Sequence, residues 1–299
     1  MVRFFSTIDE TGMRTMSLPR GVVWITGASN GIGREAAKVL AQRGWTVAAS
    51  ARNKEALQAL AKEFETIRPY PLDITHPKQR NEVYRQLRKD LGPVDALVNN
   101  AGYGTRGTVE EIDLNEMRMM YDANVLAPIA LARLVLPEMR ERRLGRIVMV
   151  SSVVGRVAFP LNGLYSSSKY ALEGLTDALR IELQPWDIKV SLVEPGPIAT
   201  GFAGTAKSNS TTRLYDEQSP YARHYNTYLS GSFFPTRQVW GPQPCAEAIR
   251  DAVENSKPKY RYPVHPVAHL LPFLQKILPT RWMDRIMGQR LGFNEKASL

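Results

Sequence analysis

Short apolar runs alternate with amphipathic stretches of helical length from Gly21 to about Val193. The apolar runs predict strands at Val22–Thr26, Thr46–Ala51, Arg68–Leu72, Val94–Asn99, Arg146–Ser151 and Lys189–Val193. The amphipathic stretches predict helices at Gly31–Arg43, Asn53–Phe64, Pro77–Leu91, Leu114–Arg142 and Leu164–Leu183. Because strands and helices alternate, we expect βαβ units and an α/β fold, a doubly wound parallel sheet with helices on both faces.

The pattern loosens after Pro195, and residues 198–240 show no clear period. This stretch is rich in aromatic residues: Phe202, Tyr215, Tyr221, Tyr225, Tyr228, Phe233, Phe234 and Trp240. Long irregular segments in a compact domain are usually functional or disordered, so we interpret this one as a lid. A helix near Cys245–Asn255 and a strand near Tyr260–Val264 follow. We therefore expect one domain over residues 21–265, after an N-terminal extension (1–20) and before an apolar, basic tail (266–299).

Composition narrows the classes of partner. Hydrophobic residues make up 43% of the chain and charged residues 23%, which is ordinary for a soluble globular protein. The net charge of +10 suits an anionic cofactor, an acidic membrane surface or nucleic acid. The basic residues are scattered rather than clustered, so we expect no nucleic-acid partner. No apolar run reaches the 18 residues of a transmembrane helix.

Targeting and metal signals are weak. Residues 1–20 lack the apolar stretch of a secretory signal, and their arginines are accompanied by Asp9 and Glu10, so a transit peptide is only weakly indicated. The single cysteine, Cys245, excludes an internal disulfide and suits a reducing compartment, so we expect a cytoplasmic protein. The four histidines show no ligand spacing; His265 and His269 are interpreted as packing residues, and no metal is expected.

The first strand leads directly into a glycine-rich loop that precedes a helix. Glycines at such a turn let the backbone approach a pyrophosphate, whose charge is stabilised by the helix N-terminus. Ser29 or Asn30 can also cap that helix. The spacing differs from the common G-x-G-x-x-G by one extra residue between the first two glycines. The candidate cofactor-binding residues of the loop are Gly27, Ser29, Asn30, Gly31, Ile32 and Gly33.

The end of the second strand indicates which dinucleotide binds. A carboxylate there hydrogen-bonds the ribose of NAD, whereas an arginine accommodates the extra phosphate of NADP. The sequence has Arg52 at this place and no carboxylate before Glu55. This favours NADP(H), although an arginine that opens a helix can also be plain surface.

Tyr165 and Lys169 lie four residues apart in a helical pattern, so their side chains share one face. A free tyrosine has a pKa of about 10, and a nearby ammonium group favours its phenolate. Such a pair can exchange a proton with a reacting oxygen. By itself, however, a Tyr/Lys pair on a helix is more often an exposed pair without a catalytic role.

Together with several other motifs in the same order, the pair makes the sequence resemble the short-chain dehydrogenase/reductase family over roughly Gly21 to Thr200. The glycine loop has the family's variant spacing, and Tyr165 to Lys169 match its Tyr-x-x-x-Lys motif. Asn124 and Ser152 stand where the family has its catalytic asparagine and serine, with Ser151 the weaker serine candidate. The further matches are Asp73 and Ile74 beside the adenine, Asn100, Ala101 and Gly102 after the fourth strand, and Pro195, Gly196, Ile198 and Thr200 beside the nicotinamide.

The resemblance implies a Rossmann-type fold and assigns the roles of four residues. Tyr165 would act as general acid in reduction and general base in oxidation, and Ser152 would hydrogen-bond the reacting oxygen. Lys169 would lower the pKa of Tyr165 and hold the nicotinamide ribose, and Asn124 would anchor a water of a proton relay. The implied enzyme interconverts an alcohol and a ketone or aldehyde with NADP(H), and the family commonly forms dimers or tetramers.

Substrate and tail are less well indicated. The aromatic lid and a looser similarity to 17β-hydroxysteroid and retinol dehydrogenases suggest a bulky apolar substrate, steroid-, retinoid- or lipid-like. The segment Thr280–Met287 predicts a short amphipathic helix that closes the pocket or contacts another subunit, with peripheral membrane binding as the second interpretation. The alternatives to this enzyme are a catalytically silent NADP(H) sensor and an NAD-dependent dehydrogenase of small carbonyls.

Overall fold

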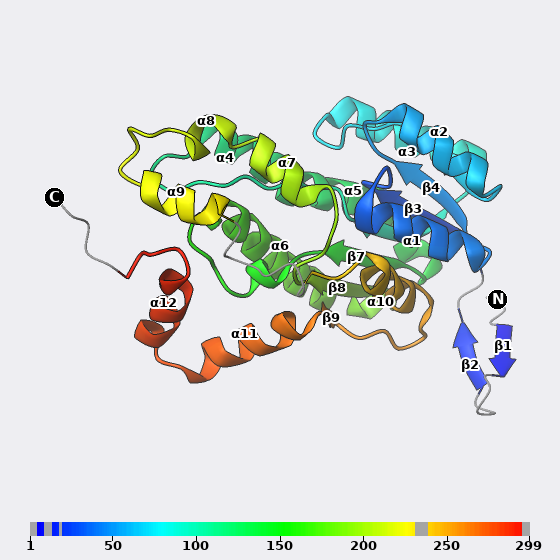
Figure 1. Ribbon diagram of the computed structural model, residues 1–299. Coiled ribbons are helices and arrows are strands. Elements are labelled where there is room, and N and C mark those ends of the chain that lie inside the picture. The colour runs from blue at the N-terminus through cyan, green and yellow to red at the C-terminus, as the bar shows by residue number, and fades with distance from the viewer. Residues whose placement is uncertain (1–4, 9–13, 18–19, 231–238, 295–299) are drawn as a thin grey trace.

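The protein, described by a computed structural model over residues 5–8, 14–17, 20–230 and 239–294, is built on one parallel sheet. The strand order is β5-β4-β3-β6-β7-β8-β9, and every neighbouring pair is parallel (Figure 1). The strands are β3 (Val22–Thr26), β4 (Thr46–Ser50), β5 (Ile67–Pro69), β6 (Val94–Asn99), β7 (Arg146–Val150), β8 (Lys189–Pro195) and β9 (Arg261–Val264). The predicted α/β, Rossmann-type fold is confirmed.

The strand order reverses beside β3. From β3 the chain moves outward through β4 and β5, and it then returns to pair β6 on the other side of β3. At such a point, the connections that leave the carboxyl ends of the two central strands diverge and open a crevice. A dinucleotide site is therefore expected beyond the carboxyl ends of β3 and β6.

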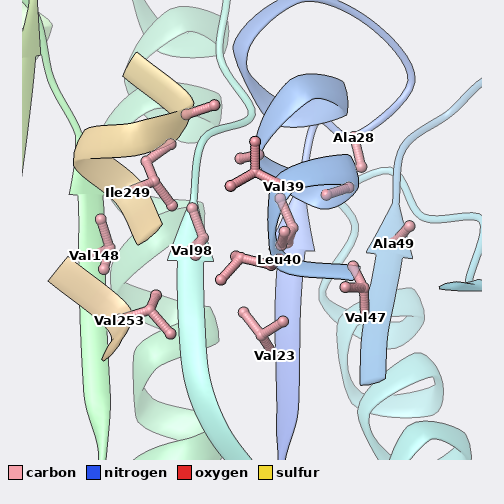
Figure 2. Close-up of a cluster of buried hydrophobic side chains, with 14 of the residues drawn as sticks. Val23, Ala28, Val39, Leu40, Val47, Ala49, Val98, Val148, Ile249 and Val253 are labelled. Carbon is pink, nitrogen blue, oxygen red and sulfur yellow. The ribbon is translucent and has the colours of Figure 1, made fainter. Parts of the chain in front are cut away.

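Helices cover both faces of the sheet. One face carries α1 (Gly31–Gln42), α2 (Lys54–Glu63) and α10 (Gln243–Glu254). The other carries α3 (Pro77–Leu91), α5 (Ala127–Arg142) and α6 (Gly163–Glu182). Figure 2 shows the first interface, where Leu40 of α1 and Ile249 of α10 pack on the central strands. Because both faces are covered, the inner strands are almost completely buried, which explains their nearly uninterrupted apolar sequences.

Two predicted elements differ from the structure. The third strand is expected over Arg68–Leu72, whereas β5 covers only Ile67–Pro69. The N–H groups of Tyr70 and Leu72 still bond to the carbonyl oxygens of Ala49 and Ala51. The prolines at 69 and 71 alternate with these donors and therefore fit this edge of the sheet without removing a bond to β4. The long helix expected over Leu114–Arg142 is α4 (Leu114–Tyr121) and α5 joined by a π-helical turn, η1 (Asp122–Leu126).

That continuous stretch, Leu114–Arg142, is long and apolar enough by composition to cross a membrane. Within its most apolar window, however, 56% is buried inside the protein, and α5 packs on the sheet. Its apolar character is thus explained by its place in the core.

The lid is more regular than the sequence suggests. It contains the short helices α7 (Phe202–Ser208), α8 (Thr211–Leu214) and α9 (Ala222–Leu229), and a parallel bridge between Ile198 and Trp240 closes its base. Helices of four to eight residues are too short to show a period in the sequence. Phe233 and Phe234 lie outside the described residues.

The tail contains the predicted helix, and the N-terminal extension contains a hairpin. The helix predicted at Thr280–Met287 is α12 (Thr280–Gln289), and it follows α11 (Pro266–Ile277). Pro272 lies inside α11 rather than ending it, so only Pro279 separates the two helices. In the N-terminal extension, β1 (Phe5–Ile8) and β2 (Arg14–Ser17) form an antiparallel hairpin.

Candidate active site

A cavity of about 1510 Å³ lies at the carboxyl ends of the strands. Of the residues predicted to form the site, Gly33 and Asn124 are outside its lining, and all others line it. Those that line it are Gly27, Ser29, Asn30, Gly31, Ile32, Arg52, Asp73, Ile74, Asn100, Ala101, Gly102, Ser152, Tyr165, Lys169, Pro195, Gly196, Ile198 and Thr200. Segments far apart in the sequence therefore meet at one place.

The glycine loop between β3 and α1 needs its glycines for two different reasons. Gly27 and Gly31 have φ angles of 68° and 53°, in the left-handed region that disfavours other residues. At Gly33 a Cβ would lie 2.4 Å from the carbonyl oxygen of Gly27, so only glycine allows the helix to pack against the loop. Together these positions bring bare backbone to the N-terminus of α1.

The start of α1 leaves room for an anion. Asn30 occupies the N-cap position, but its side chain makes no capping hydrogen bond, contrary to the expectation that Ser29 or Asn30 caps this helix. The first turn also contains no acidic residue. Uncapped N–H groups at a helix N-terminus, together with the helix dipole, attract phosphate.

Asn100 holds the glycine loop from the neighbouring strand. Its Nδ2 donates to the carbonyl oxygens of Thr26 and Gly27 at 3.0 and 3.2 Å. The hydroxyl of Thr26 in turn accepts from the backbone N–H groups of Asn100 and Ala101, each at 3.1 Å. These bonds join the ends of β3 and β6 across the point where the strand order reverses.

Arg52 and Asp73 line the cavity after β4 and β5. Arg52 is exposed and precedes α2, which is capped by Asn53 through a 2.8 Å bond from the backbone N–H of Ala56. Burial alone would raise the pKa of Asp73, but hydrogen bonds from Thr75 and the nearby positive charges, Arg52 among them, hold it below its usual value. A polar, charged end of the cavity results.

Tyr165, Ser152 and Lys169 come together at the centre of the cavity. Tyr165 and Lys169 lie on one face of α6, with Nζ of Lys169 5.8 Å from the centroid of the tyrosine ring. Nζ donates to the carbonyl oxygen of Val150 at 2.9 Å, which fixes it to the end of β7. Ser152 caps the short helix η2 (Val153–Gly155), and its hydroxyl hydrogen-bonds Tyr165. The three polar groups are buried.

Burial dominates the protonation of this pair. It raises the pKa of Tyr165 to about 12, and the opposing influences are the charge of Arg106 and the hydrogen bond from Ser152. Lys169 is not among these influences, so the expected lowering of the Tyr165 pKa by Lys169 stays a prediction. Burial also lowers the pKa of Lys169 to about 8, against the opposing charge of Glu173. Tyr165 is accordingly protonated at neutral pH, as a proton donor must be.

Asn124 is held in the π-helical turn η1 and is fully buried. Its Nδ2 donates to the carbonyl oxygen of Tyr103 at 2.9 Å and to Oγ of Ser168 at 3.1 Å. Its Oδ1 accepts from the backbone N–H of Tyr103 at 3.1 Å. Both amide hydrogens are thus engaged by protein, so the side chain fastens the loop after β6 beside Lys169. The predicted role as a water anchor stays a prediction.

A buried group of charges lies behind the lysine on α6. Glu173, one turn after Lys169, and Glu194 at the end of β8 both pair with Arg261 of β9. The Arg261–Glu194 distance is 2.6 Å, and Arg156 also reaches Glu194, at 3.2 Å. Burial and the charge of Glu194 raise the pKa of Glu173. Arg261 therefore fastens the last strand to the helix that carries Tyr165 and Lys169.

The segment after β8 closes the site from the lid side. A Cβ at Gly196 would lie 2.7 Å from Cβ of His265, so this glycine is needed for close approach. Thr200 packs against Gly31 of the glycine loop. His265 accepts from the backbone N–H of Val267 through Nδ1 and thereby caps α11, in line with a structural role. Within the described residues no cluster of ligands could hold a metal ion.

The comparisons with known proteins agree with this geometry. Residues 21–211 match the family described as short chain dehydrogenase. The chain belongs to the short-chain dehydrogenase/reductase family. It is therefore an NAD(P)-dependent oxidoreductase that takes a small-molecule substrate and a nucleotide cofactor.

Several relatives of this short-chain dehydrogenase span most of its length. "Uncharacterized oxidoreductase YbbO" of Escherichia coli is 34% identical over 94% of this chain and 99% of its own. Human "Retinol dehydrogenase 8" is 36% identical over 81% of this chain and 80% of its own. A "3-ketodihydrosphingosine reductase" of Bacteroides thetaiotaomicron is 31% identical over 84% and 90% of the two chains.

Solved structures share the fold. A short-chain dehydrogenase from Streptomyces avermitilis superposes with a TM-score of 0.75 at 31% identity, covering 94% of this chain and 100% of that one. A metagenomic member in complex with NADP has a TM-score of 0.58 at 31% identity, over 60% and 84%. A Burkholderia phymatum protein in complex with NAD, at 21% identity and a TM-score of 0.74 over 93% and 96%, shows the likeness of fold alone.

Sequence reasoning missed several residues of this dehydrogenase that line the cavity on the side of the lid and the tail. Arg106, Phe159, Leu161, Leu229 and Leu291 line it but belong to no motif. They come from loops, the lid and the C-terminal tail, so only tertiary structure brings them together. The aromatic content of the lid was the one available signal, and it found Phe202 and Tyr228.

Proposed function

We propose that this protein interconverts a bulky apolar alcohol and its ketone or aldehyde with NADP(H), with Tyr165 as general acid and base. The observation that carries the proposal is the meeting of Tyr165, Ser152 and Lys169 at the boundary between two halves of one cavity. One half is formed by the glycine loop and Arg52, and the other includes apolar side chains from the lid and the tail.

The first half fits a dinucleotide. Its pyrophosphate would lie on the bare backbone from Gly27 to Gly33, at the uncapped N-terminus of α1. Arg52, which lines the cavity after β4, is placed to meet the additional phosphate of NADP, and the described chain has no carboxylate at the end of β4. The similarity to a metagenomic relative in complex with NADP supports the same preference. When bound, the nicotinamide supplies or accepts the hydride.

The protein's own residues handle the proton. During reduction the carbonyl carbon gains a hydride, the C=O electron pair moves to oxygen, and that oxygen takes the proton of the Tyr165 hydroxyl. Ser152, which hydrogen-bonds Tyr165, donates to the same oxygen and stabilises its developing charge. Lys169 lies close enough to stabilise the phenolate that remains. Oxidation reverses each transfer.

The second half favours an apolar substrate. Phe159, Leu161, Phe202, Leu229 and Leu291 contribute apolar side chains to its lining. The names of the relatives point the same way, since retinol dehydrogenase 8 and 3-ketodihydrosphingosine reductase are named for lipid-like molecules. Leu291 comes from the tail, which supports a role of the tail as pocket cover.

The proposal is tested by the initial rates of NADPH and NADH oxidation with steroid, retinoid, long-chain and short-chain carbonyl compounds. We expect turnover of bulky apolar carbonyls with NADPH and a kcat/KM at least about tenfold lower with NADH, because the Arg52–phosphate contact is lost. Turnover of small polar carbonyls alone would overturn the substrate class. Tight NADPH binding without any turnover would instead indicate the silent sensor. Cytoplasmic location and a homo-dimer or homo-tetramer stay predictions.

A further inference from the structure

Arg106 lies in the substrate end of the cavity, close to Tyr165. It belongs to the loop that follows β6 and lines the cavity. A Cβ placed on Gly104 would be 2.8 Å from Cζ of Phe202 and 3.5 Å from Nη1 of Arg106, so both side chains lie beside this glycine. The ring of Phe202 is in turn 5.1 Å from that of Tyr165. Arg106 thus lines the same cavity as Tyr165, near enough for its charge to act on the tyrosine.

The guanidinium of Arg106 is fixed by neutral acceptors. Its Nη1 donates to Oδ1 of Asn162 at 2.8 Å and to the carbonyl oxygen of Thr105 at 3.0 Å. Its Nε donates to the hydroxyl of Tyr228 at 3.2 Å, and the tyrosine ring lies 5.9 Å from the guanidinium carbon. The backbone N–H donates to Oγ of Ser210 at 2.6 Å. The side chain is therefore positioned before any substrate arrives.

The positive charge of Arg106 has no counter-ion in the described part of the chain, and its Nη2 has no acceptor there. Its neighbour Arg213 is different, because Nη2 of Arg213 pairs with Glu116 at 2.6 Å. Glu116 also lines the cavity; the ion pair engages its Oε2, whereas its Oε1 is buried without a hydrogen-bond partner in the described part of the chain. A half-buried guanidinium with a free donor is a ready partner for an anion.

We infer that the natural substrate is an oxo acid or hydroxy acid, an apolar molecule whose carboxylate binds Arg106. This inference rests on the proposed function and narrows its substrate class. Arg106 is a substrate-binding residue that orients the carbonyl toward Tyr165. In the reaction the carbonyl carbon gains the hydride and its oxygen gains the proton of Tyr165, while the carboxylate stays unchanged. The apolar body of the substrate packs on Leu161, Leu229 and Leu291.

Matched pairs of substrates test the inference. Long-chain keto acids with increasing separation between carbonyl and carboxylate are compared with their methyl esters, which have the same carbon skeleton but no charge. For the best spacing we expect kcat/KM of the acid to exceed that of its ester by about tenfold or more, since a charge-assisted hydrogen bond is lost in the ester. Because acid and ester are compared in the same enzyme, any effect of Arg106 on the reactivity of Tyr165 changes both kcat/KM values equally and cancels in their ratio.

Three variants separate charge from structure. Arg106→Gln should bring the acid-to-ester ratio close to one, and Arg106→Lys should keep part of the preference because the charge remains. Arg118→Gln is the matched control: it removes an exposed arginine outside the lining and should leave the ratio unchanged. A ratio near one in the wild type, or a preference that survives in Arg106→Gln, would overturn the inference.

A binding measurement tests the carboxylate site independently of the proposed oxidoreductase activity. Calorimetric titration with decanoate and with decanol needs no turnover. We expect the wild type, but not Arg106→Gln, to bind decanoate about tenfold more tightly than decanol. If no carbonyl is reduced while this difference appears, the proposed function fails and the acid site stands. If neutral carbonyls are reduced, but keto acids are not preferred over their esters and decanoate is not preferred over decanol, the proposed function stands and the acid site fails.

Discussion

Replacing Lys169 by methionine should stabilise the protein while abolishing its activity. Nζ of Lys169 is buried, and its pKa falls from an ordinary 10.5 to about 8. That difference corresponds to about 3 kcal/mol by which the folded state disfavours the ammonium at neutral pH. Methionine keeps the apolar stem and removes the charge. It also leaves the carbonyl oxygen of Val150 without its donor, which costs about 1 kcal/mol.

The net gain of about 2 kcal/mol should raise Tm at pH 7 by about 3 °C in a chain of this size, measured by differential scanning calorimetry. Because the pKa of Lys169 is lower in the folded state, the unfolded chain binds more protons between pH 8 and pH 10.5. The wild type therefore becomes relatively more stable as the pH rises through that window. The advantage of Lys169→Met should be complete below pH 8 and largely gone by about pH 10.

Lys62→Met is the matched control, because Lys62 is exposed in the last turn of α2 and this substitution should change stability by less than about 0.5 kcal/mol at any pH. A Lys169→Met protein that melts below the wild type at pH 7 would refute the reasoning, as would an advantage that does not shrink with rising pH.

Three other variants test the cofactor and substrate ends of the cavity. Gly33→Ala should weaken NADPH binding by at least about tenfold in a fluorescence titration, because its Cβ would collide with the backbone of Gly27; unchanged affinity would contradict the packing argument. Arg52→Asp should lower kcat/KM with NADPH by about tenfold or more and leave the value with NADH nearly unchanged; equal losses would show that Arg52 does not select the phosphate. Leu291→Ala removes a buried side chain of the tail that lines the cavity. It should raise the KM for a bulky carbonyl compound several-fold and change the KM for a small one little. Equal effects on both would argue that the tail does not cover the pocket.

The sequence predicts the sheet and the cofactor half of the cavity well, because both rest on local patterns. Buried parallel strands are continuous apolar runs, and the glycine loop requires glycines that are visible as such in the sequence. Two elements differ from the prediction, the strand β5 and the turn η1. The regular part of β5 ends at Pro69, earlier than the apolar run predicts, and the π-helical turn η1, which carries Asn124, has no periodic signal.

The substrate half could not be predicted, because its residues depend on tertiary contacts. Arg106 appears in the sequence as one of many scattered basic residues, and only the structure shows that it lines the cavity and contacts Tyr228. Leu291 joins from a tail that follows the last strand. The protonation of Tyr165 is another collective property, since burial outweighs the influence of any single neighbour. Motifs thus indicate the chemistry, whereas the packing of loops and tail determines the substrate.

The central claim is that the hydroxyl of Tyr165 gives its proton to the carbonyl oxygen. It is tested most directly by single-turnover oxidation of enzyme-bound NADPH, with the fastest carbonyl compound of the panel, in the wild type and in Tyr165→Phe. Phenylalanine preserves the ring that packs on Phe202 and removes only the hydroxyl. We predict a rate lower by about a thousandfold with unchanged affinity for NADPH. A Tyr165→Phe enzyme that retains a rate within about tenfold of the wild type would contradict the account.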